Sequence, residues 1–260
     1  MEKFGKSQPV KRVEDVRFLT GHGRYVDDVA PDNALYAFML RAPVAHAKIT
    51  GLDVEEARAS EGVRAVLTAD DLKAAGIEES MTSAIIKNSD GSMGASPRRP
   101  LLAEDRLRFV GEPVAFIVAE TLDAARDAAE LIELDYEDLP AKMDIAPGGP
   151  AIHEDTPDNV AFDWGMGDEV ATQAAFAAAA RTVSLDVPDN RIIVNSLEPR
   201  GCYAEWEGDR VHVSIGGQGV WGNKAEIAKI LGIDADNVRV TNPDTGGGFG
   251  MKGFPYPEYT

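Results

Sequence analysis

The stretch Val110-Gly111-Glu112-Pro113-Val114-Ala115-Phe116-Ile117-Val118, with the two segments after it, decides the fold of the first half of the chain. Its continuous apolar run is typical of a buried strand, and its Gly and Pro predict a bend near the start. Thr121 is placed to cap a helix over 122–132, where small apolar residues recur at helical spacing. Residues 133–137 then predict a return strand.

Upstream of this unit the pattern predicts three further strands and two short helices. Thr68 is placed to cap the second of these helices. Residues 77–104 lack a period and are rich in Ser, Asn, Gly and Pro, which predicts a long surface loop. Because the strands are short, we expect a compact α+β domain of about 140 residues rather than a long parallel sheet. The expected strands are 35–42, 48–54 and 63–67, and the expected helices are 53–58 and 69–72.

Downstream of a Pro- and Gly-rich linker at 146–150, the pattern changes to a crossing segment, helices and several short strands. Glu207-Gly208-Asp209-Arg210 predicts a hairpin turn between two of these strands. We expect the strands to form an antiparallel meander. The crossing segment is 151–166, the helices are 169–180 and 224–231, and the strands are 182–187, 192–196, 202–207, 211–215 and 238–240.

The composition bounds both the size of the core and the classes of partner. With 260 residues, 44% of them hydrophobic, the chain can form one large domain or two ordinary ones. Its net charge of -18 argues against nucleic acid and anionic membranes, because both bind clustered Lys and Arg. The acidic surface either keeps the protein soluble or faces a partner subunit. The start Met1–Lys6 lacks the apolar core of a signal peptide, and no long apolar stretch follows, so we expect a cytoplasmic protein without a membrane span.

The cysteine and the histidines do not form a recognisable metal or nucleophile motif. Cys202 is the only cysteine, so no intrachain disulfide and no Cys-rich zinc or iron–sulfur site can form within this chain. We expect it to be a buried core thiol. His22, His46, His153 and His212 lack metal-ligand spacing, so we expect structural or exposed roles and no metal ligands.

Two glycine runs fit the dinucleotide-binding pattern G-x-G-x-x-G. The run 248–253 is followed by two prolines that forbid the helix on which a pyrophosphate would rest. The run 217–222 lies between a predicted strand and a predicted helix, with Asp244 at about the distance of a ribose-binding acid. Trp221 and the expected meander argue against this second run. A nicotinamide-dependent oxidoreductase that uses the Gly217–Gly222 loop is kept as an alternative.

Gln218 and the run Gly246-Gly247-Gly248-Phe249-Gly250-Met251-Lys252 form the strongest candidate for a ligand site. Glycines leave backbone amides uncovered, and a ring among them can close one wall of a pocket. A glutamine in a glycine loop at a strand–helix junction can donate its amide N–H to an anionic or oxo ligand. Either the two loops converge on one ligand, or they are simply turns rich in glycine.

In its ordered motifs the chain resembles the large, molybdenum-binding subunit of the xanthine dehydrogenase/aldehyde oxidase family, and within it the aerobic carbon monoxide dehydrogenase-like branch. The matching segments follow the family's order through nearly the whole chain. One departure is Val44, which replaces the first histidine of the family's Arg-Ser-Pro-His-Ala-His segment. The matching segments are Arg12–Asp15, Leu19–Asp28, Arg41–Ala47, Arg99–Ala103, Val110–Ala115, Asn195–Gly201, the Gln218 loop and the Gly-Gly-Phe-Gly run.

This resemblance implies an α/β-hammerhead domain over residues 1–145 and a partial molybdopterin-binding domain over 146–260. It implies that Gln218 hydrogen-bonds an oxo ligand of molybdenum. It also implies that the cofactor-binding loop next to the metal and its substrate is formed by Gly247, Gly248, Phe249 and Gly250. The implied cofactor is molybdopterin cytosine dinucleotide with molybdenum, and the implied partners are a 2Fe-2S small subunit and an FAD-binding medium subunit. Such an enzyme oxidises a small molecule with water-derived oxygen, or oxidises CO.

The departures from the family pattern bear on activity. Purine-oxidising members place a substrate-binding glutamate where this chain has Gly253, so the resemblance implies that purines are not substrates. The family's general base is expected beyond Thr260, so no catalytic residue is expected in this fragment, which alone would be inactive. We therefore expect an N-terminal or split-gene part of a molybdenum hydroxylase large subunit. A non-catalytic assembly or scaffold homologue is a further alternative.

Overall fold

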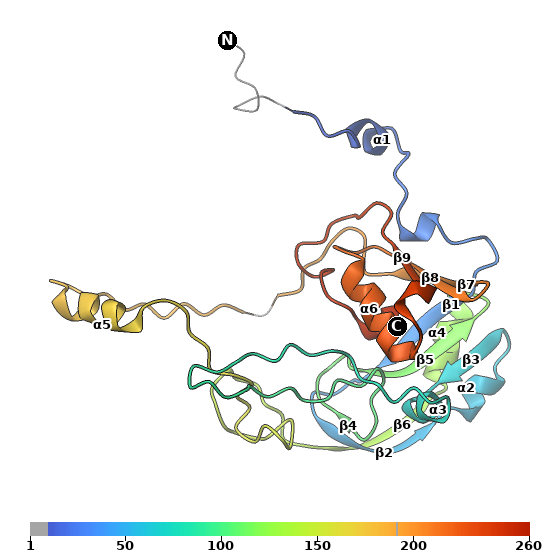
Figure 1. Cartoon of the computed structure of the whole chain (residues 1–260). Coiled ribbons are helices and arrows are strands. Elements are labelled where there is room, and N and C mark those ends of the chain that lie inside the picture. The colour runs from blue at the N-terminus through green and yellow to red at the C-terminus, as the bar shows by residue number, and fades with distance from the viewer. Residues whose placement is uncertain (1–9, 191) are drawn as a thin grey trace, which may run out of the picture. The chain divides into compact units, whose positions relative to one another are not determined.

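The computed structural model describes residues 10–190 and 192–260 of the chain (Figure 1). The chain groups into two compact units. Of the described residues, the larger unit comprises 34–190, 192–194, 229–232 and 260, and the smaller unit comprises 10–33, 195–228 and 233–259. The Met1–Lys6 segment, from which we predicted the absence of a signal peptide, lies outside the described residues. The domain boundary between residues 145 and 146 stays a prediction.

The first sheet of the larger unit is antiparallel, in the order β1 (Tyr36–Arg41), β5 (Pro113–Ala119), β3 (Val63–Leu67). Helices α2 (Glu55–Ala59) and α4 (Leu122–Glu130) pack against this sheet. Alanines on the buried face of α4 let the helix approach the sheet closely, because they carry only a methyl group. The resulting core consists of Val54, Ala57, Val66, Ala115, Ile117, Ala119, Ala125, Ala128 and Ala129.

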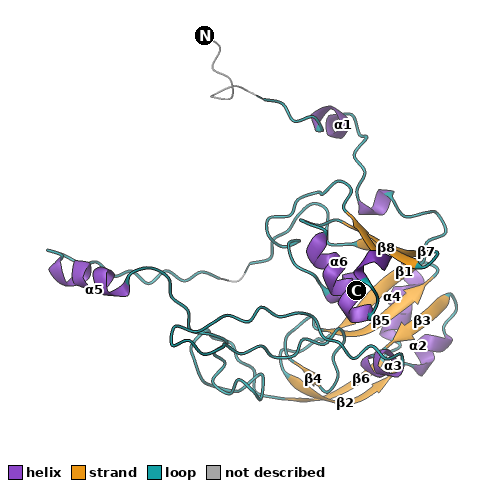
Figure 2. Ribbon diagram, in the orientation of Figure 1, coloured by secondary structure: helices purple, strands orange, loops and turns teal. Residues whose placement is uncertain are grey.

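The second sheet of the larger unit is also antiparallel, in the order β4 (Arg106–Leu107), β2 (Ala47–Asp53), β6 (Glu133–Asp138). Leu40 and Leu52 pack against the core clusters of both sheets, so the two sheets share one apolar interior. The second cluster consists of Ala42, Ala47, Ala103, Leu107 and Val114. Mixed helices and short antiparallel strands, coloured in Figure 2, confirm the predicted α+β class.

Two helices of the larger unit begin at the caps that the sequence predicted. In front of α3 (Ala69–Ala74), the Asp71 N–H donates to the Thr68 hydroxyl, and the Thr68 N–H donates to the Asp71 carboxylate at 2.7 Å. In front of α4, the Ala124 N–H donates to the Thr121 hydroxyl at 3.1 Å. Such caps satisfy backbone donors that the first turn of a helix leaves without partners.

Two details of the larger unit differ from the prediction. Strand β5 begins only at Pro113, because Gly111 adopts a φ of +90° and the Glu112 N–H donates to the Phe109 carbonyl in a turn. Strand β4 was not predicted, since two residues carry no periodic signal. The predicted loop over 77–104 is confirmed, because the structure has no helix or named strand there. Its surface position is wrong near both ends, where the apolar side chains of Met81 and of residues 101–103 are buried.

The segment around α5 (Glu169–Ala178) makes few contacts in the larger unit. Asp168 caps the helix by accepting a hydrogen bond from the Ala171 N–H at 2.8 Å, yet no residue of α5 is buried. The strands predicted at 182–187 and 192–196 are wrong: no ladder includes these residues. A strand needs a hydrogen-bonded partner, and apolar alternation alone does not supply one.

The smaller unit contains a three-stranded sheet in the order β7 (Cys202–Glu207), β8 (Arg210–Ile215), β9 (Val238–Thr241). Strands β7 and β8 form the predicted hairpin, with Glu207 opposite Arg210. Strand β9 is parallel to β8, so the predicted antiparallel meander is wrong. Helix α6 (Trp221–Leu231) connects these two strands, and such a crossover returns the chain in its original direction.

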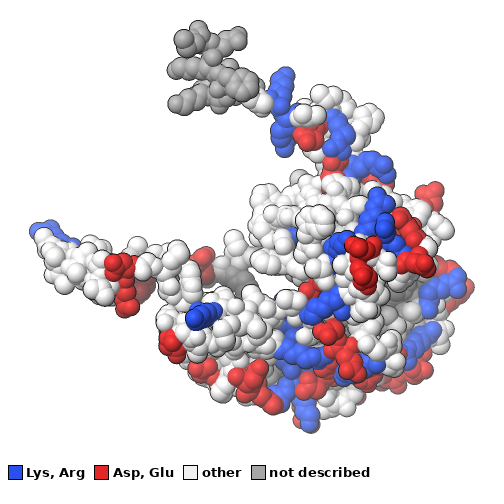
Figure 3. Space-filling model, in the orientation of Figure 1, with Lys and Arg blue, Asp and Glu red and all other residues white. Residues whose placement is uncertain are grey.

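The remaining helical turns are short: α1 (Asp15–Leu19) and the 3-10 turns η1 (Val26–Asp28), η2 (Ala235–Asn237) and η3 (Pro257–Tyr259). Across residues 10–190 and 192–260, no helix combines the length and apolar character needed to cross a membrane. On the face shown in Figure 3, basic and acidic side chains are interspersed.

Candidate cofactor site

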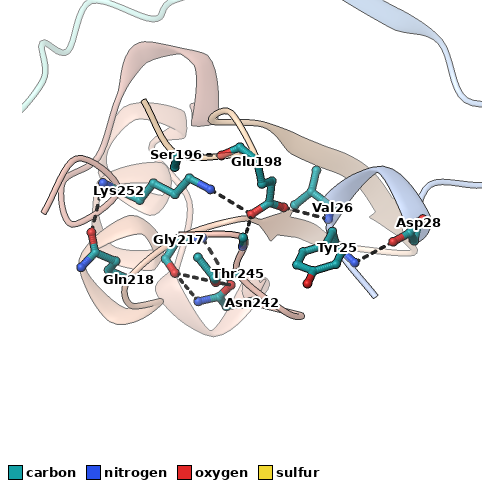
Figure 4. A network of polar contacts seen from close by, with 11 residues as sticks. Tyr25, Val26, Asp28, Ser196, Glu198, Gly217, Gln218, Asn242, Thr245 and Lys252 are labelled. Carbon is teal, nitrogen blue, oxygen red and sulfur yellow. Dashed lines mark hydrogen bonds and ion pairs between the residues drawn. The ribbon is translucent and has the colours of Figure 1, made fainter. Parts of the chain in front are cut away.

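The loop that carries Gln218 lies between β8 and α6 and is held by side chains that follow β9. The Gly217 N–H donates to Asn242 Oδ1 at 3.3 Å, and Asn242 Nδ2 donates back to the Gly217 carbonyl at 2.7 Å. The Thr245 hydroxyl donates to the same carbonyl at 3.0 Å (Figure 4). Because β8 and β9 are parallel, the loop and the residues after β9 meet at one end of the sheet.

Gln218 joins this loop to the glycine loop, which we define as residues 246–252. The Gln218 N–H donates to the Lys252 carbonyl at 3.0 Å. In the opposite direction, the Gly250 and Lys252 N–H groups donate to Gln218 Oε1 at 2.9 and 3.2 Å. Two donors identify the oxygen of the side-chain amide, so the Nε2 group is the part of Gln218 turned away from the loop backbone. The structure thus brings the two predicted loops together.

Two glycines of the glycine loop allow this close approach. A Cβ at Gly248 would lie 2.5 Å from Gln218 Cδ, and a Cβ at Gly246 would lie 2.4 Å from Glu198 Cβ. Atoms that close would clash, so neither position has room for a side chain. By contrast, a Cβ at Gly250 would meet no atom within 4 Å, so open space lies beside that part of the loop.

The outer part of the glycine loop presents donors and an aromatic ring. Among the described residues, the N–H groups of Gly247, Gly248 and Phe249 donate to no acceptor. Gly247 has a φ of +100°, and Phe249 has a φ of +52°, which is uncommon for a bulky residue. Phe249 is 77% exposed. Strained residues of this kind cluster at ligand sites, where the surrounding structure holds them in place.

Glu198 and Lys252 support the glycine loop from its buried side (Figure 4). Lys252 is fully buried, and its Nζ donates to Glu198 Oε2 at 2.8 Å. The Gly246 N–H donates to the same oxygen at 2.7 Å, and the Val26 N–H donates to Oε1 at 3.3 Å. Burial by itself raises the pKa of the Glu198 carboxyl, but the hydrogen bonds from Lys252, Gly246 and Val26 outweigh it and hold that pKa below its ordinary value.

The sequence did not identify Glu198 and Lys252 as members of the site. Both residues occur in quoted motifs, but they are 54 positions apart, and no local spacing links a glutamate to a lysine at that separation. The presence of a lysine two positions after the last glycine of the Gly246–Gly250 run was the only available signal. It is weak, since most lysines are exposed.

The Gly217–Gly222 run has the topology of a dinucleotide-binding loop but lacks two of its other features. The parallel β8–α6–β9 unit removes the topological objection to a dinucleotide loop. Two other observations argue against a dinucleotide-binding loop. A Cβ at Gly222 would meet nothing within 4 Å, so this glycine is not required for close helix–strand packing. Asp244 is already engaged, because its carboxylate accepts hydrogen bonds from the Arg24 N–H at 2.7 Å and from the Arg17 guanidinium.

The other titratable residues singled out by the sequence lie apart from the two loops. The Cys202 thiol donates to the Glu258 carbonyl, and burial raises the pKa of this thiol to about 11. His212 lies opposite Glu205 in the β7–β8 ladder and near Glu207, at 3.4 Å from each carboxylate. This cluster is not apparent from the sequence, because its members come from two strands. Its residues are also partly exposed, as ordinary surface ion pairs are.

Comparison with known proteins assigns both halves of the chain. Residues 20–140 match the domain described as "Aldehyde oxidase and xanthine dehydrogenase, a/b hammerhead domain". Residues 152–260 match the molybdopterin cofactor-binding domain, which contains both candidate loops.

Two similar proteins are named as a large subunit and a large chain. The nicotine 6-hydroxylase large subunit of Paenarthrobacter nicotinovorans is 38% identical, over 98% of this chain and 31% of its own length. The carbon monoxide dehydrogenase large chain of Hydrogenophaga pseudoflava is 34% identical, over 95% of this chain and 32% of its own length. This chain therefore spans about a third of the length of these curated relatives.

Solved structures are also similar to this chain over nearly its whole length. The quinoline 2-oxidoreductase of Pseudomonas putida 86 superposes with a TM-score of 0.81 at 32% identity, covering 96% of this chain and 32% of that one. A copper- and molybdenum-containing carbon monoxide dehydrogenase superposes with a TM-score of 0.77 at 33% identity, covering 96% and 32%. The two domain matches and these relatives show that the chain belongs to the xanthine dehydrogenase/aldehyde oxidase family, among its carbon monoxide dehydrogenase-like, molybdenum-binding large subunits.

Proposed function

We propose that the two loops form one side of the molybdenum-cofactor site of a molybdenum hydroxylase large subunit. The observation that carries this proposal is the fixed Gln218 amide beside a glycine loop whose three successive N–H groups have no acceptor in the described protein. The donors fit a ligand rich in electronegative atoms, and the open space beside Gly250 gives it room. The match of residues 152–260 to a molybdopterin cofactor-binding domain supports the same ligand.

In this arrangement the protein binds and orients, while the reactive chemistry belongs to the cofactor. The bound group would supply two-electron oxidation of a small molecule with oxygen derived from water. Gln218 Nε2 would donate to an electronegative atom of the cofactor, and the amides of Gly247, Gly248 and Phe249 would donate beside it. Phe249 is exposed, and its ring would border the space where a substrate approaches.

The finer identity of the cofactor and partners is part of this proposal. We propose molybdopterin cytosine dinucleotide as the form bound, and a 2Fe-2S small subunit and an FAD medium subunit as the electron acceptors. The relatives support such an assembly, since their names describe a "large subunit" and a "large chain". Gly253 stands where purine-oxidising members carry a glutamate, so purines are not among the proposed substrates.

The first test is the composition of the whole protein, purified from its source with any subunits that accompany it. Mass spectrometry of metals should find molybdenum, and acid hydrolysis should release CMP. A complete assembly with neither would overturn the proposal. A stable assembly with partner subunits but no molybdenum would favour the scaffold role instead.

A variant pair tests the role of Gln218 in that protein. Gln218→Ala should lower kcat by about 100-fold, because a donor next to the reacting centre is lost. Gln173→Ala is the matched control, since Gln173 lies on the exposed helix α5 and should leave kcat unchanged. Equal activity of both variants would remove Gln218 from the site.

Nicotinamide binding by the Gly217–Gly222 loop is a second candidate, favoured only by the parallel β8–α6–β9 unit. Calorimetric titration with NAD decides it. Tight binding that is lost in Gly219→Glu would support this candidate, and no detectable heat in the wild type would dismiss it.

A further inference from the structure

The glycine loop is closed into a ring by the ion pair at its base. At the start of the loop, Glu198 holds both backbone groups of Gly246: its Oε2 accepts from the Gly246 N–H at 2.7 Å, and its N–H donates to the Gly246 carbonyl at 3.1 Å. At the end of the loop, Gln218 holds both backbone groups of Lys252, at 3.0 and 3.2 Å. The Lys252 side chain then returns to Glu198 at 2.8 Å and completes the ring.

The burial of this ion pair makes it a strong constraint. The Lys252 side chain is 0% exposed and the Glu198 side chain 16% exposed, so water competes little for either charge. A surface ion pair holds its partners weakly, whereas a buried charge that loses its partner is left without compensation. Separating Lys252 from Glu198 is therefore unfavourable. Because Lys252 is part of the glycine loop, its fixed side chain also restrains the backbone of the loop.

This closed set of contacts also connects the ion pair to the Gln218 amide and to Phe249. Gln218 Oε1 accepts from both Gly250 and Lys252, so a displacement of Lys252 changes the direction of the Gln218 amide. The same displacement moves Phe249, which lies between the two held ends of the loop. Neither Glu198 nor Lys252 faces the ligand side, so both act through other residues.

We propose that Glu198 and Lys252 are positioning residues, whose buried ion pair fixes the Gln218 amide and the Phe249–Gly250 turn at the geometry that the cofactor and substrate require. This inference rests on the proposed function for the identity of the ligand. The closure of the loop itself is independent of that identity. A displacement of about 1 Å at such a site is enough to slow a reaction by about 100-fold.

Lys252→Met is the variant that tests the proposal in the whole purified protein. Methionine keeps an unbranched side chain and removes the charge. Val238→Ala is the matched control, because Val238 is 2% exposed in the same unit and pairs with Val211, at the end of β8 remote from the Gln218 loop. This control lowers thermal stability by making a cavity, without removing any hydrogen bond of the loop.

Three measurements separate positioning from general stability. In Lys252→Met, hydrogen exchange of the peptide over 246–254 should become about 10-fold faster, since the hydrogen bonds of its backbone amides open more often. The kcat should fall about 10- to 100-fold with little change in KM and with molybdenum content retained. Val238→Ala should lower Tm while leaving loop exchange and kcat at wild-type values.

A double variant covers the case in which Lys252→Met does not fold. Glu198→Gln/Lys252→Met leaves no unpaired buried charge, so it should fold where the single variant fails, and should still show the faster loop exchange. Wild-type loop exchange in either variant that folds, or equal loosening of the loop in Val238→Ala, overturns the positioning role. A wild-type protein without molybdenum instead overturns the proposed function. The two failures are therefore distinguishable.

Discussion

The core of the larger unit and the site loops of the smaller unit are held by different kinds of contact. In the larger unit, fully buried apolar residues such as Ile117 and Ala128 fill the space between sheet and helices. In the smaller unit, the loops that carry the candidate site are held by hydrogen bonds and one buried ion pair, between Glu198 and Lys252. Apolar packing tolerates exchanges of similar volume, whereas a polar network depends on each donor and acceptor. Stability and site geometry can therefore be disturbed separately.

A large loss of stability is expected from a cavity in the larger unit. Ile117→Ala removes a side chain that is 0% exposed in the central strand β5, and should lower the free energy of unfolding by about 2–5 kcal/mol. Ile117→Val should cost only about 0.5–1.5 kcal/mol. Thermal unfolding measures both. If Ile117→Ala also accelerated hydrogen exchange in the glycine loop, the contrast between the units would be wrong.

A smaller loss of stability, but a large loss of cofactor, is expected from Gly248→Ala. The new Cβ would lie 2.5 Å from Gln218 Cδ, and such overpacking costs about 1–3 kcal/mol. Because Gln218 must move away, molybdenum content should also fall. Gly222→Ala is the control: its Cβ meets nothing within 4 Å, and it should stabilise α6 by about 0.5 kcal/mol. Normal metal content in Gly248→Ala would contradict the proposed loop geometry.

The ion pair between Glu198 and Lys252 should make the stability of the folded protein depend on pH. The pKa of Glu198 is lowered in the folded state, so the unfolded chain takes up the proton first as the pH falls. The stabilisation is therefore complete above the pKa of an unfolded glutamate, about 4.3, and is lost as the pH falls through the folded pKa. The difference in Tm between wild type and Lys252→Met should narrow between neutral and acidic pH. A difference that stays constant would show that Glu198 is not the titrating group.

The smallest effect is expected from an exposed ion pair in the larger unit. Arg64 and Glu120 form a pair with side chains 60% and 52% exposed. Arg64→Gln should change the free energy of unfolding by less than about 1 kcal/mol, since water and salt screen such charges. Thermal unfolding at low and high salt measures the effect. A loss as large as that of Lys252→Met would mean that burial does not distinguish the two ion pairs.

Local features of the larger unit were predicted well because they depend on neighbours in the sequence. Thr68 and Thr121 cap the helices that the pattern assigned to them, through contacts three residues away. The apolar run of β5 was recognised because each of its residues carries the signal. The two-residue strand β4 was missed for the opposite reason.

Features that need a distant partner were predicted poorly. The alternation at 182–187 and 192–196 suggested strands, yet neither segment joins a ladder. The parallel pairing of β8 with β9 was missed because short strands carry no mark of their direction. The pair of loops was recognised from glycines, a glutamine and a family resemblance, but their contact through Gln218 Oε1 came only from the structure.

By itself, the sequence determined the α+β class, the helix caps, the family and the residues to examine, because short-range periodicity and ordered motifs are written along the chain. Only the tertiary structure decided that Lys252 is buried and paired with Glu198, and that Gln218 turns its oxygen to the glycine loop. The physical reason is that burial and the choice of hydrogen-bond partner depend on which distant segments meet. A lysine has the same covalent structure whether it lies in water or beside a buried carboxylate.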